Sequence, residues 1–276
     1  MNTTGSGFST GSTIERPRLP DPQSSPPRPS VAAIVASLHG RAGKTLLARI
    51  LADYFILSGR RPALFDTDAT ERMLHSAFPD DAIVVDLTEV RDQMILFDTL
   101  VARSAAARVV DVSHHTARKF FKVMQESHFV AEARARQVEP VIFHIMDRNS
   151  DSYEAARLLR ERFEDCALVL VENAYLGKVK DQTRRSTGYR AFEDHELRMT
   201  LPCLDPEVLD IVEDIHLSLS DLMREPLSRG ASGGPLSFDE RAYLRSWLGR
   251  IFRDIHRVTR AIEARALSPA PADPPS

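Results

Sequence analysis

Short apolar segments alternate with segments of helical periodicity along most of the chain. Several of the apolar segments are hydrophobic on both faces, which is typical of strands covered by helices on each side. The alternation predicts an α/β fold with a doubly wound, mostly parallel sheet and helices on both faces. We expect strands at Val31–Ser37, Pro62–Asp66, Ile83–Leu87, Arg108–Ser113, Pro140–Met146, Leu168–Asn173 and Thr200–Leu204. Helices are expected at Lys44–Ser58, Thr116–Val138 and Ser152–Phe163, among others.

A C-terminal amphipathic helix is expected over residues 237–267. Ser237 and Glu240 have the spacing of a capping box. Three interpretations stay open: packing on the chain's own domain or a partner helix, binding an anionic membrane surface, or binding DNA phosphates. The apolar stripe favours packing, because interfacial helices are richer in lysine and exposed aromatic residues. The stripe consists of Leu244, Leu248, Ile251, Ile255, Val258 and Ile262.

The remaining segments divide the chain by composition. Six of the 17 prolines lie within residues 1–30 and four within 268–276, so both ends are expected to be disordered. Residues 31–225 are expected to form the sheet domain. Residues 226–236 contain a Gly/Ser-rich stretch that is typical of a linker.

Overall composition excludes several classes of protein. The net charge of −3 provides no global positive field for nucleic acid. No 18 consecutive apolar residues occur and the first thirty residues lack the apolar core of a signal peptide, so a cytoplasmic protein is expected. Cys166 and Cys203 lack CxxC spacing, and we expect two buried free thiols.

A glycine-containing loop follows the first predicted strand and opens a helix. This context suits a phosphate-binding loop, because backbone amides and the positive end of the helix attract phosphate oxygens. The lysine would reach the terminal phosphates, and the threonine hydroxyl would hold Mg²⁺. The candidate residues are Gly40, Arg41, Ala42, Gly43, Lys44 and Thr45.

The loop departs from the strict pattern at one position. A glycine is expected six residues before the lysine, where this chain has Leu38. A dinucleotide-binding fingerprint is excluded more firmly, since the chain has no G-x-G-x-x-G sequence.

Carboxylates follow the second predicted strand at Asp66 and Asp68. In an open parallel sheet this end of a strand faces the ligand crevice. A carboxylate there is suited to orient an attacking water or a Mg²⁺-bound water. The alternative is that one of the two aspartates caps the next helix.

Two further strands end in an aspartate that could lie near a magnesium ion. Asp111 is preferred to Asp86, because His114 and His115 continue a polar loop beyond it. The two histidines have no third ligand at metal spacing, so a zinc site is not predicted. Asn173 ends another strand, where its amide could contact a base edge or simply begin a loop; both interpretations stay open.

Over about residues 31–222 these motifs resemble the partition-type ATPases of the ParA/MinD group. This branch of the P-loop proteins includes plasmid-partition, division-site and conjugation-associated members. The likeness rests on the loop His39–Thr45, the strand ends at Asp66, Asp111 and Asn173, and the segment Leu201–Pro202. The arrangement looks most similar to the TraL/MobD-like accessory ATPases of conjugation.

The resemblance implies ATP and Mg²⁺ as cofactors. Carried over by position, Lys44 and Thr45 match the phosphate and Mg²⁺ residues. Asp66 and Asp68 match the pair that organises the water and the metal. The remaining matches are Asp111 for the second magnesium-associated aspartate, Asn173 for the adenine-side asparagine and Pro202 for the neighbourhood of the base-contacting loop.

Two departures from the family pattern concern charge. In the family a signature lysine crosses a nucleotide-sandwiched dimer to the partner's phosphates, and here His39 stands in its place. A neutral imidazole is a poor substitute for a permanent cation. Arg41 replaces the second glycine and either reaches across the dimer as an arginine finger or is a solvated loop residue. ATP binding is therefore expected more strongly than efficient hydrolysis.

Three functions remain under consideration. The leading one is a nucleotide-switched ATP-binding protein with weak ATPase activity in a plasmid or mobile-element partition or conjugative-transfer system. It would form a nucleotide-dependent homodimer and bind a partner protein; DNA binding stays open, and membrane binding is not expected. The second is a non-hydrolysing docking scaffold. A P-loop small-molecule kinase is disfavoured, because only Asp181–Arg190 offers an arginine-rich lid.

Overall fold

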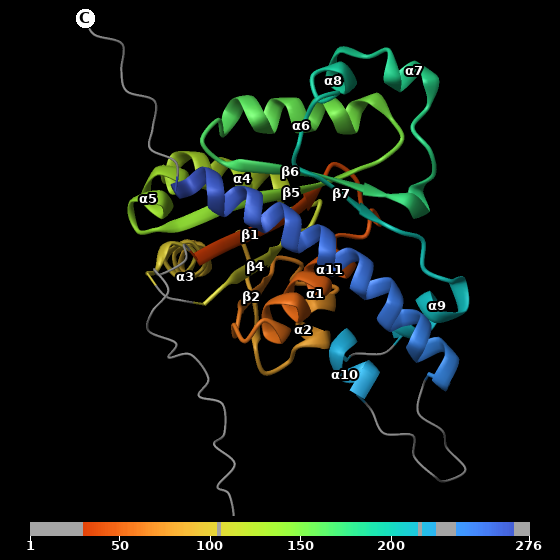
Figure 1. The fold of residues 1–276 in the computed structure, drawn as a ribbon. Coiled ribbons are helices and arrows are strands. Elements are labelled where there is room, and N and C mark those ends of the chain that lie inside the picture. Colours follow the sequence, from red (N-terminus) through yellow and green to blue (C-terminus); the bar gives the residue numbers. More distant parts are fainter. Residues whose placement is uncertain (1–29, 104–105, 215–216, 225–235, 268–276) are drawn as a thin grey trace, which may run out of the picture.

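Seven parallel strands form one sheet in the computed structural model, which describes residues 30–103, 106–214, 217–224 and 236–267 (Figure 1). The strands are β1 (Ser30–Ser37), β2 (Ala63–Asp66), β3 (Ala82–Val84), β4 (Arg108–Asp111), β5 (Val138–Met146), β6 (Ala167–Asn173) and β7 (Arg198–Leu201). Their spatial order is β3-β2-β4-β1-β5-β6-β7, and every neighbouring pair is parallel. The predicted α/β fold is confirmed, with β1 at the centre of the sheet.

Helices cover both faces of the sheet. One layer contains α1 (Lys44–Leu57), α2 (Met73–Ala77), α9 (Pro206–Asp214), α10 (Leu219–Arg224) and α11 (Phe238–Leu267). The opposite layer contains α3 (Val90–Val101), α4 (Ala117–Glu126), α5 (Phe129–Ala135) and α6 (Ser150–Arg162). Two short helices, α7 (Asp181–Arg184) and α8 (Thr187–Arg190), pack on α6. The segment Asp181–Arg190, which was considered as a kinase lid, therefore packs on α6.

The central strand β1 shows why hydrophobic and polar residues do not alternate along the predicted strands. Val31, Ala33 and Val35 lie in the core beneath α1, whereas Ala32 and Ile34 lie in the core on the other face. All are buried, because parallel strands with helices on both sides have no solvent-facing side.

Several predicted boundaries differ from those observed. The helix expected over Thr116–Val138 is two helices, because His128 adopts a left-handed conformation with φ of 49° between them. The strand expected at Thr200–Leu204 lies earlier, at Arg198–Leu201, and stops before Pro202, which has no N–H for a ladder. The third strand also ends earlier, at Val84.

Parts of the predicted domain division lie outside the described residues, namely the tails 1–29 and 268–276 and the linker 226–235. Ser30, assigned to the first tail, begins β1, and Leu236, assigned to the linker, is buried. The expectation for the cysteines is right for Cys166 and wrong for Cys203, which is exposed in the loop after Pro202. Across the described ranges, no helix is both long enough and apolar enough to cross a membrane.

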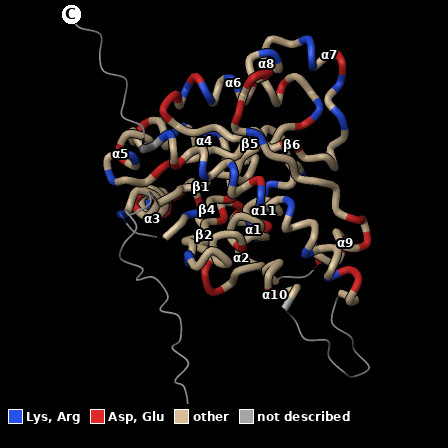
Figure 2. Tube along the Cα trace, viewed as in Figure 1, with Lys and Arg blue, Asp and Glu red and all other residues tan. Residues whose placement is uncertain are grey.

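Helix α11 packs on the sheet domain. All six residues of its aliphatic stripe are buried, and Trp247 Nε1 donates a hydrogen bond to the Pro202 carbonyl at 2.9 Å. The predicted capping box is present, with Ser237 N donating to Glu240 Oε2 at 2.6 Å and Glu240 N to Ser237 Oγ at 3.2 Å. Figure 2 shows basic and acidic residues intermingled along the chain. Of the three interpretations of this helix, the structure supports packing.

Buried charged residues of α1 contact α9 and the beginning of α10. Arg49 donates to the carbonyls of Val212 and Leu217, at 2.9 and 2.7 Å. Asp53 accepts from the backbone amides of Leu219 and Ser220. Because α1 begins at Lys44, these contacts fix the helix that carries the candidate phosphate loop.

Replacing Ile255 by alanine tests the docking of α11. The side chain is fully buried, so Ile255→Ala is expected to lower the free energy of unfolding by about 2–5 kcal/mol, measured by urea denaturation. Arg250→Ala on the exposed face of the same helix is the control and should change it by less than about 0.5 kcal/mol. Equal stability of the two variants would contradict the docked arrangement.

Candidate functional site

Polar residues gather at the carboxyl edge of the sheet. Because the strands are parallel, the ends of β1, β2, β4, β5 and β6 lie on the same side. The residues at these ends are the loop His39–Thr45 and, in chain order, Asp66, Asp111, Asp147 and Asn173. In open α/β sheets this edge is where ligands bind.

The loop between β1 and α1 contains two left-handed residues. Arg41 has φ of 56° and Gly43 has φ of 94°. Gly43 is required for a second reason, since a Cβ atom there would lie 2.8 Å from Asn173 Nδ2. The loop therefore requires glycine at position 43 for two reasons: the left-handed φ, and the lack of room for a Cβ atom beside Asn173.

Lys44 is buried beneath the beginning of this loop. Its ammonium donates to Ser37 Oγ at 3.2 Å and to the His39 carbonyl at 3.3 Å. Burial lowers the pKa of Lys44, and the negative charges of Asp111 and Asp68 oppose this effect. The cation is thus placed beside the first residues of the loop.

Thr45 and Asp111 link the start of α1 to β4. The Thr45 hydroxyl donates to Asp111 Oδ2 at 2.6 Å. Asp111 is buried, and its Oδ1 has no hydrogen-bond partner within the described residues. Burial raises the pKa of Asp111 to about 7, although the Thr45 hydrogen bond favours the carboxylate.

Asp111 and Asp86 were both considered from the sequence as the aspartate near a magnesium ion, and their positions in the structure differ. Asp111 ends β4, which pairs directly with β1, and it contacts the loop through Thr45. Asp86 follows β3 at the edge of the sheet and accepts hydrogen bonds from Thr88. Of the two, Asp111 is the one that touches the loop.

Asp66 lies opposite Asp111 in the register of β2 and β4. Its Oδ1 accepts from the amide of Asp68 at 3.0 Å, and its Oδ2 accepts from the amides of Leu74 and His75 at 2.9 and 3.1 Å. Burial raises the pKa of this carboxyl group. Asp66 therefore holds the turn and the beginning of α2.

Asp68 is more accessible than Asp66 and faces the loop after β4. Its Oδ2 accepts from the Ser113 hydroxyl at 2.8 Å, and its Oδ1 from the amides of Thr70 and Glu71. Partial burial opposes ionisation, but these hydrogen bonds lower the pKa of Asp68 overall. Asp68 is thus an ionised, partly exposed carboxylate.

Asn173 and Pro202 have different surroundings. Asn173 Nδ2 donates to the Ala42 carbonyl at 2.9 Å, so this side chain holds the loop. Its Oδ1 accepts from the amide of Tyr175 at 3.0 Å. Pro202 lies at the α11 interface, where its carbonyl accepts from Trp247.

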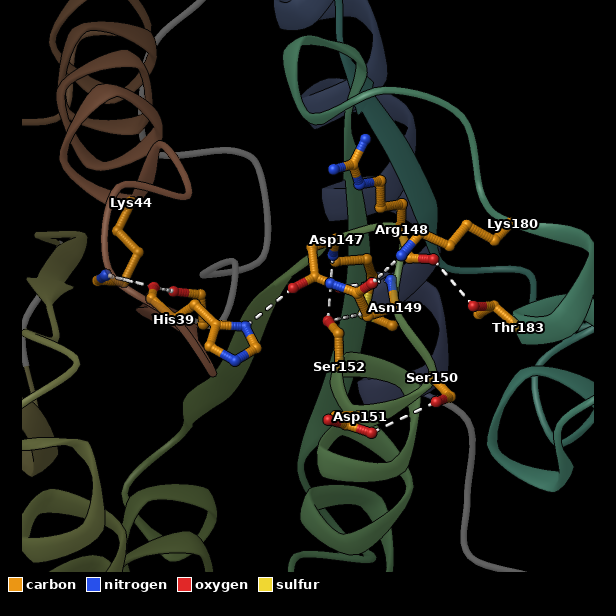
Figure 3. A network of polar contacts seen from close by, with 12 residues as sticks. His39, Lys44, Asp147, Arg148, Asn149, Ser150, Asp151, Ser152, Lys180 and Thr183 are labelled. Atoms are coloured by element: carbon orange, nitrogen blue, oxygen red, sulfur yellow. Dashed lines mark hydrogen bonds and ion pairs between the residues drawn. The ribbon is translucent and has the colours of Figure 1, made fainter.

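His39 is bound to a residue of its own chain. Its Nδ1 lies 2.8 Å from Asp147 Oδ2, and the two side chains point toward each other in Figure 3. Asp147 Oδ1 accepts from the amide of Asn149 at 2.7 Å, which fixes the carboxylate. Arg41 is exposed and has no ion-pair partner in the described part of the chain.

Asp147 is a site residue that was not predicted from the sequence. The available signal was its position directly after the apolar strand that ends at Met146, the same signal that identified Asp66 and Asp111. Clusters of three or more His, Cys, Asp or Glu side chains suited to a metal ion do not occur among the residues that the structure describes.

Comparisons with known proteins give only a likeness of fold. No family model and no curated protein sequence matches the chain. MinD from Pyrococcus horikoshii, solved with Mg-ADP, is 12% identical over 84% of this chain and 98% of that one, with a TM-score of 0.47. The MinC:MinD cell division protein complex of Aquifex aeolicus is 13% identical over 79% of this chain and 96% of that one, with a TM-score of 0.45. A nucleotide-binding protein of Archaeoglobus fulgidus in complex with ADP is 14% identical over 67% of this chain and 87% of that one, with a TM-score of 0.42. At these values the likeness carries no conclusion about function.

Gly43→Ala tests the close approach of Asn173 to the loop. The new Cβ would meet both an unfavourable φ and the Asn173 amide, so we expect a loss of about 1–3 kcal/mol in unfolding free energy. Gly59→Ala is a matched control, because Gly59 has φ of 75° with nothing within 4 Å.

The difference between these variants isolates the contact. Gly43→Ala should cost less stability in an Asn173→Ala background than in the unchanged chain, because only the cost of the backbone conformation then remains. A Gly43 variant as stable as the Gly59 variant would show that the contact is not formed in solution.

Proposed function

We propose that this chain binds Mg-ATP at the loop Gly40–Thr45 and acts as a nucleotide-switched protein with weak ATPase activity. The observation that carries the proposal is the joint placement of Lys44, Thr45 and Asp111 at the start of α1. Lys44 would bind the phosphates, whereas Thr45 and Asp111 would hold a magnesium ion.

The phosphates would bind at the N-terminus of α1. The unpaired amides at the beginning of a helix and its positive dipole end attract anions. The ammonium of Lys44 already lies beside His39 and Ser37, where it would meet the terminal phosphates. Gly40, Arg41, Ala42 and Gly43 would supply backbone amides around them.

A magnesium ion fits the donor set next to these phosphates. Mg²⁺ prefers oxygen ligands and is usually bound by one or two protein groups together with substrate phosphates. Thr45 supplies a hydroxyl, and Asp111 supplies a buried carboxyl oxygen without a partner in the described residues. When bound, the ion would neutralise charge on the phosphates; Asp66, opposite Asp111, adds negative charge to its surroundings.

The adenine would lie toward the ends of β6 and β7. Asn173 uses one amide hydrogen on the Ala42 carbonyl, which leaves a second for a base edge. Pro202 follows β7, where α11 holds its backbone. This part of the proposal rests on the position of the residues and on the sequence resemblance.

Hydrolysis is expected to be slow. Asp66 has three backbone amides on its oxygens, so Asp68 is the better placed carboxylate to orient an attacking water. His39 is held by Asp147 of the same chain and offers no permanent charge to a second copy. The His39–Asp147 contact also favours a second candidate, a non-hydrolysing nucleotide-binding scaffold.

The switch would operate through a nucleotide-dependent homodimer. Arg41 is exposed and carries a permanent charge, so it would be the residue that reaches the phosphates of a second copy. A partner protein would distinguish the two states. From the sequence resemblance we further propose a role in a plasmid or mobile-element partition or conjugative-transfer system.

Lys44→Ala tests the nucleotide site. Loss of the ammonium would leave phosphate charge uncompensated in a partly buried site, so the thermal shift with Mg-ATP should disappear. For the unchanged protein, a hundredfold excess of ATP over its Kd stabilises the fold by about 2.7 kcal/mol. Lys119→Ala, on the exposed side of α4, is the control and should keep the shift. Equal shifts in the Lys44 and Lys119 variants would refute the site.

Arg41→Gly tests the action of the arginine across a dimer. Glycine suits the left-handed φ at this position, so the substitution removes the charge without disturbing the loop. Light scattering should show no ATP-dependent dimer, and phosphate release should stop, while monomer affinity for ATP stays within about twofold. Arg41→Lys should retain part of the dimer. Unchanged assembly in Arg41→Gly would make this arginine a solvated loop residue.

A further inference from the structure

The imidazole of His114 lies against the first glycine of the loop. A Cβ atom placed on Gly40 would be 3.0 Å from His114 Cε1, 3.1 Å from Nε2 and 3.3 Å from Nδ1. These three atoms form the nitrogen-bearing edge of the ring. Because the three distances are nearly equal, the ring lies with its face over Gly40 on its nitrogen-bearing side, which places the ring nitrogens beside the loop.

The ring of His115 lies against the ring of His114 in a tilted arrangement. The two ring centroids are 3.7 Å apart, with 42° between the ring planes. Both side chains are exposed, and neither ring has a hydrogen-bond partner in the described ranges of the chain. The ring nitrogens of His114 are consequently available to a ligand.

Lys44 shows which phosphate would lie at this end of the loop. Its ammonium contacts the carbonyl of His39, the residue directly before Gly40. Since the lysine of a phosphate loop reaches the outermost phosphates, those phosphates would lie at the Gly40 end. This is the end that His114 covers.

We propose that His114 donates a hydrogen bond to the terminal phosphate of a bound nucleoside triphosphate, so that the site distinguishes triphosphate from diphosphate through this side chain. The inference rests on the proposed nucleotide binding and adds a residue that the loop motif does not contain.

The charged groups around His114 are consistent with this role. Partial burial lowers the pKa of His114, and the positive charges of His115 and Lys44 act in the same direction, while Asp68 and Glu71 oppose them. A neutral imidazole has one N–H donor and one acceptor. It can therefore donate one hydrogen bond to a phosphate oxygen.

The test compares affinities for two nucleotides by isothermal titration calorimetry. Mg²⁺ with ADP and Mg²⁺ with the β,γ-imido analogue of ATP are titrated into the full chain. His114→Ala should weaken binding of the triphosphate analogue by about tenfold or more and leave ADP affinity within about twofold. His114→Gln, which keeps an N–H donor, should restore part of the difference.

His256→Ala is the control, since this exposed imidazole of α11 contacts Tyr54, ten residues along α1 from Lys44. It should leave both affinities unchanged. Equal weakening of both nucleotides in His114→Ala would show that the ring only supports the loop and would overturn the inference while leaving nucleotide binding intact. No change in either affinity would overturn it as well. Absence of binding by the unchanged protein would remove the proposed function and the inference together.

Discussion

A buried carboxyl group that accepts one hydrogen bond governs the chemistry of this sheet edge. Asp111 receives the Thr45 hydroxyl on one oxygen, and the other oxygen has no partner in the described residues. An isolated carboxylate in such surroundings is costly, and the pKa near 7 means that a proton competes with ionisation at neutral pH. A cation at this place would favour the charged form and release the proton. In the proposed site, binding of a cation beside Asp111 would therefore be accompanied by release of a proton.

The loop is held in shape by the protein before any ligand enters. Asn173 holds the Ala42 carbonyl from β6, and His39 is tied to Asp147 at the end of β5. Strands on both sides of the loop therefore contribute to its conformation. A preformed loop loses less conformational entropy when it binds, which favours affinity, and it also restricts the movements by which His39 could serve a second copy.

Sequence patterns identified the sheet and the strand-end residues, because both follow from local rules. Apolar strands followed by polar residues gave Asp66, Asp111 and Asn173, and the parallel sheet brings them to one edge. The pairing of His39 with Asp147 was not predictable, since 108 residues separate them and only the adjacency of β1 and β5 brings them together. Nor does a sequence show that the oxygens of Asp66 are occupied by the amides of Asp68, Leu74 and His75. The break at His128 was missed because helical periodicity continues across it.

Helix α1 extends from the loop after β1 to the region where it contacts α10 and α11. Its 14 residues span about 21 Å, from Lys44 to the region where Tyr54 meets Phe252 and His256 of α11. Midway along it, Arg49 donates to the Val212 carbonyl of α9, and Asp53 accepts from the Leu219 amide at the start of α10. These contacts with α10 and α11 are the route by which a shift of the loop end of α1 would reach the two helices.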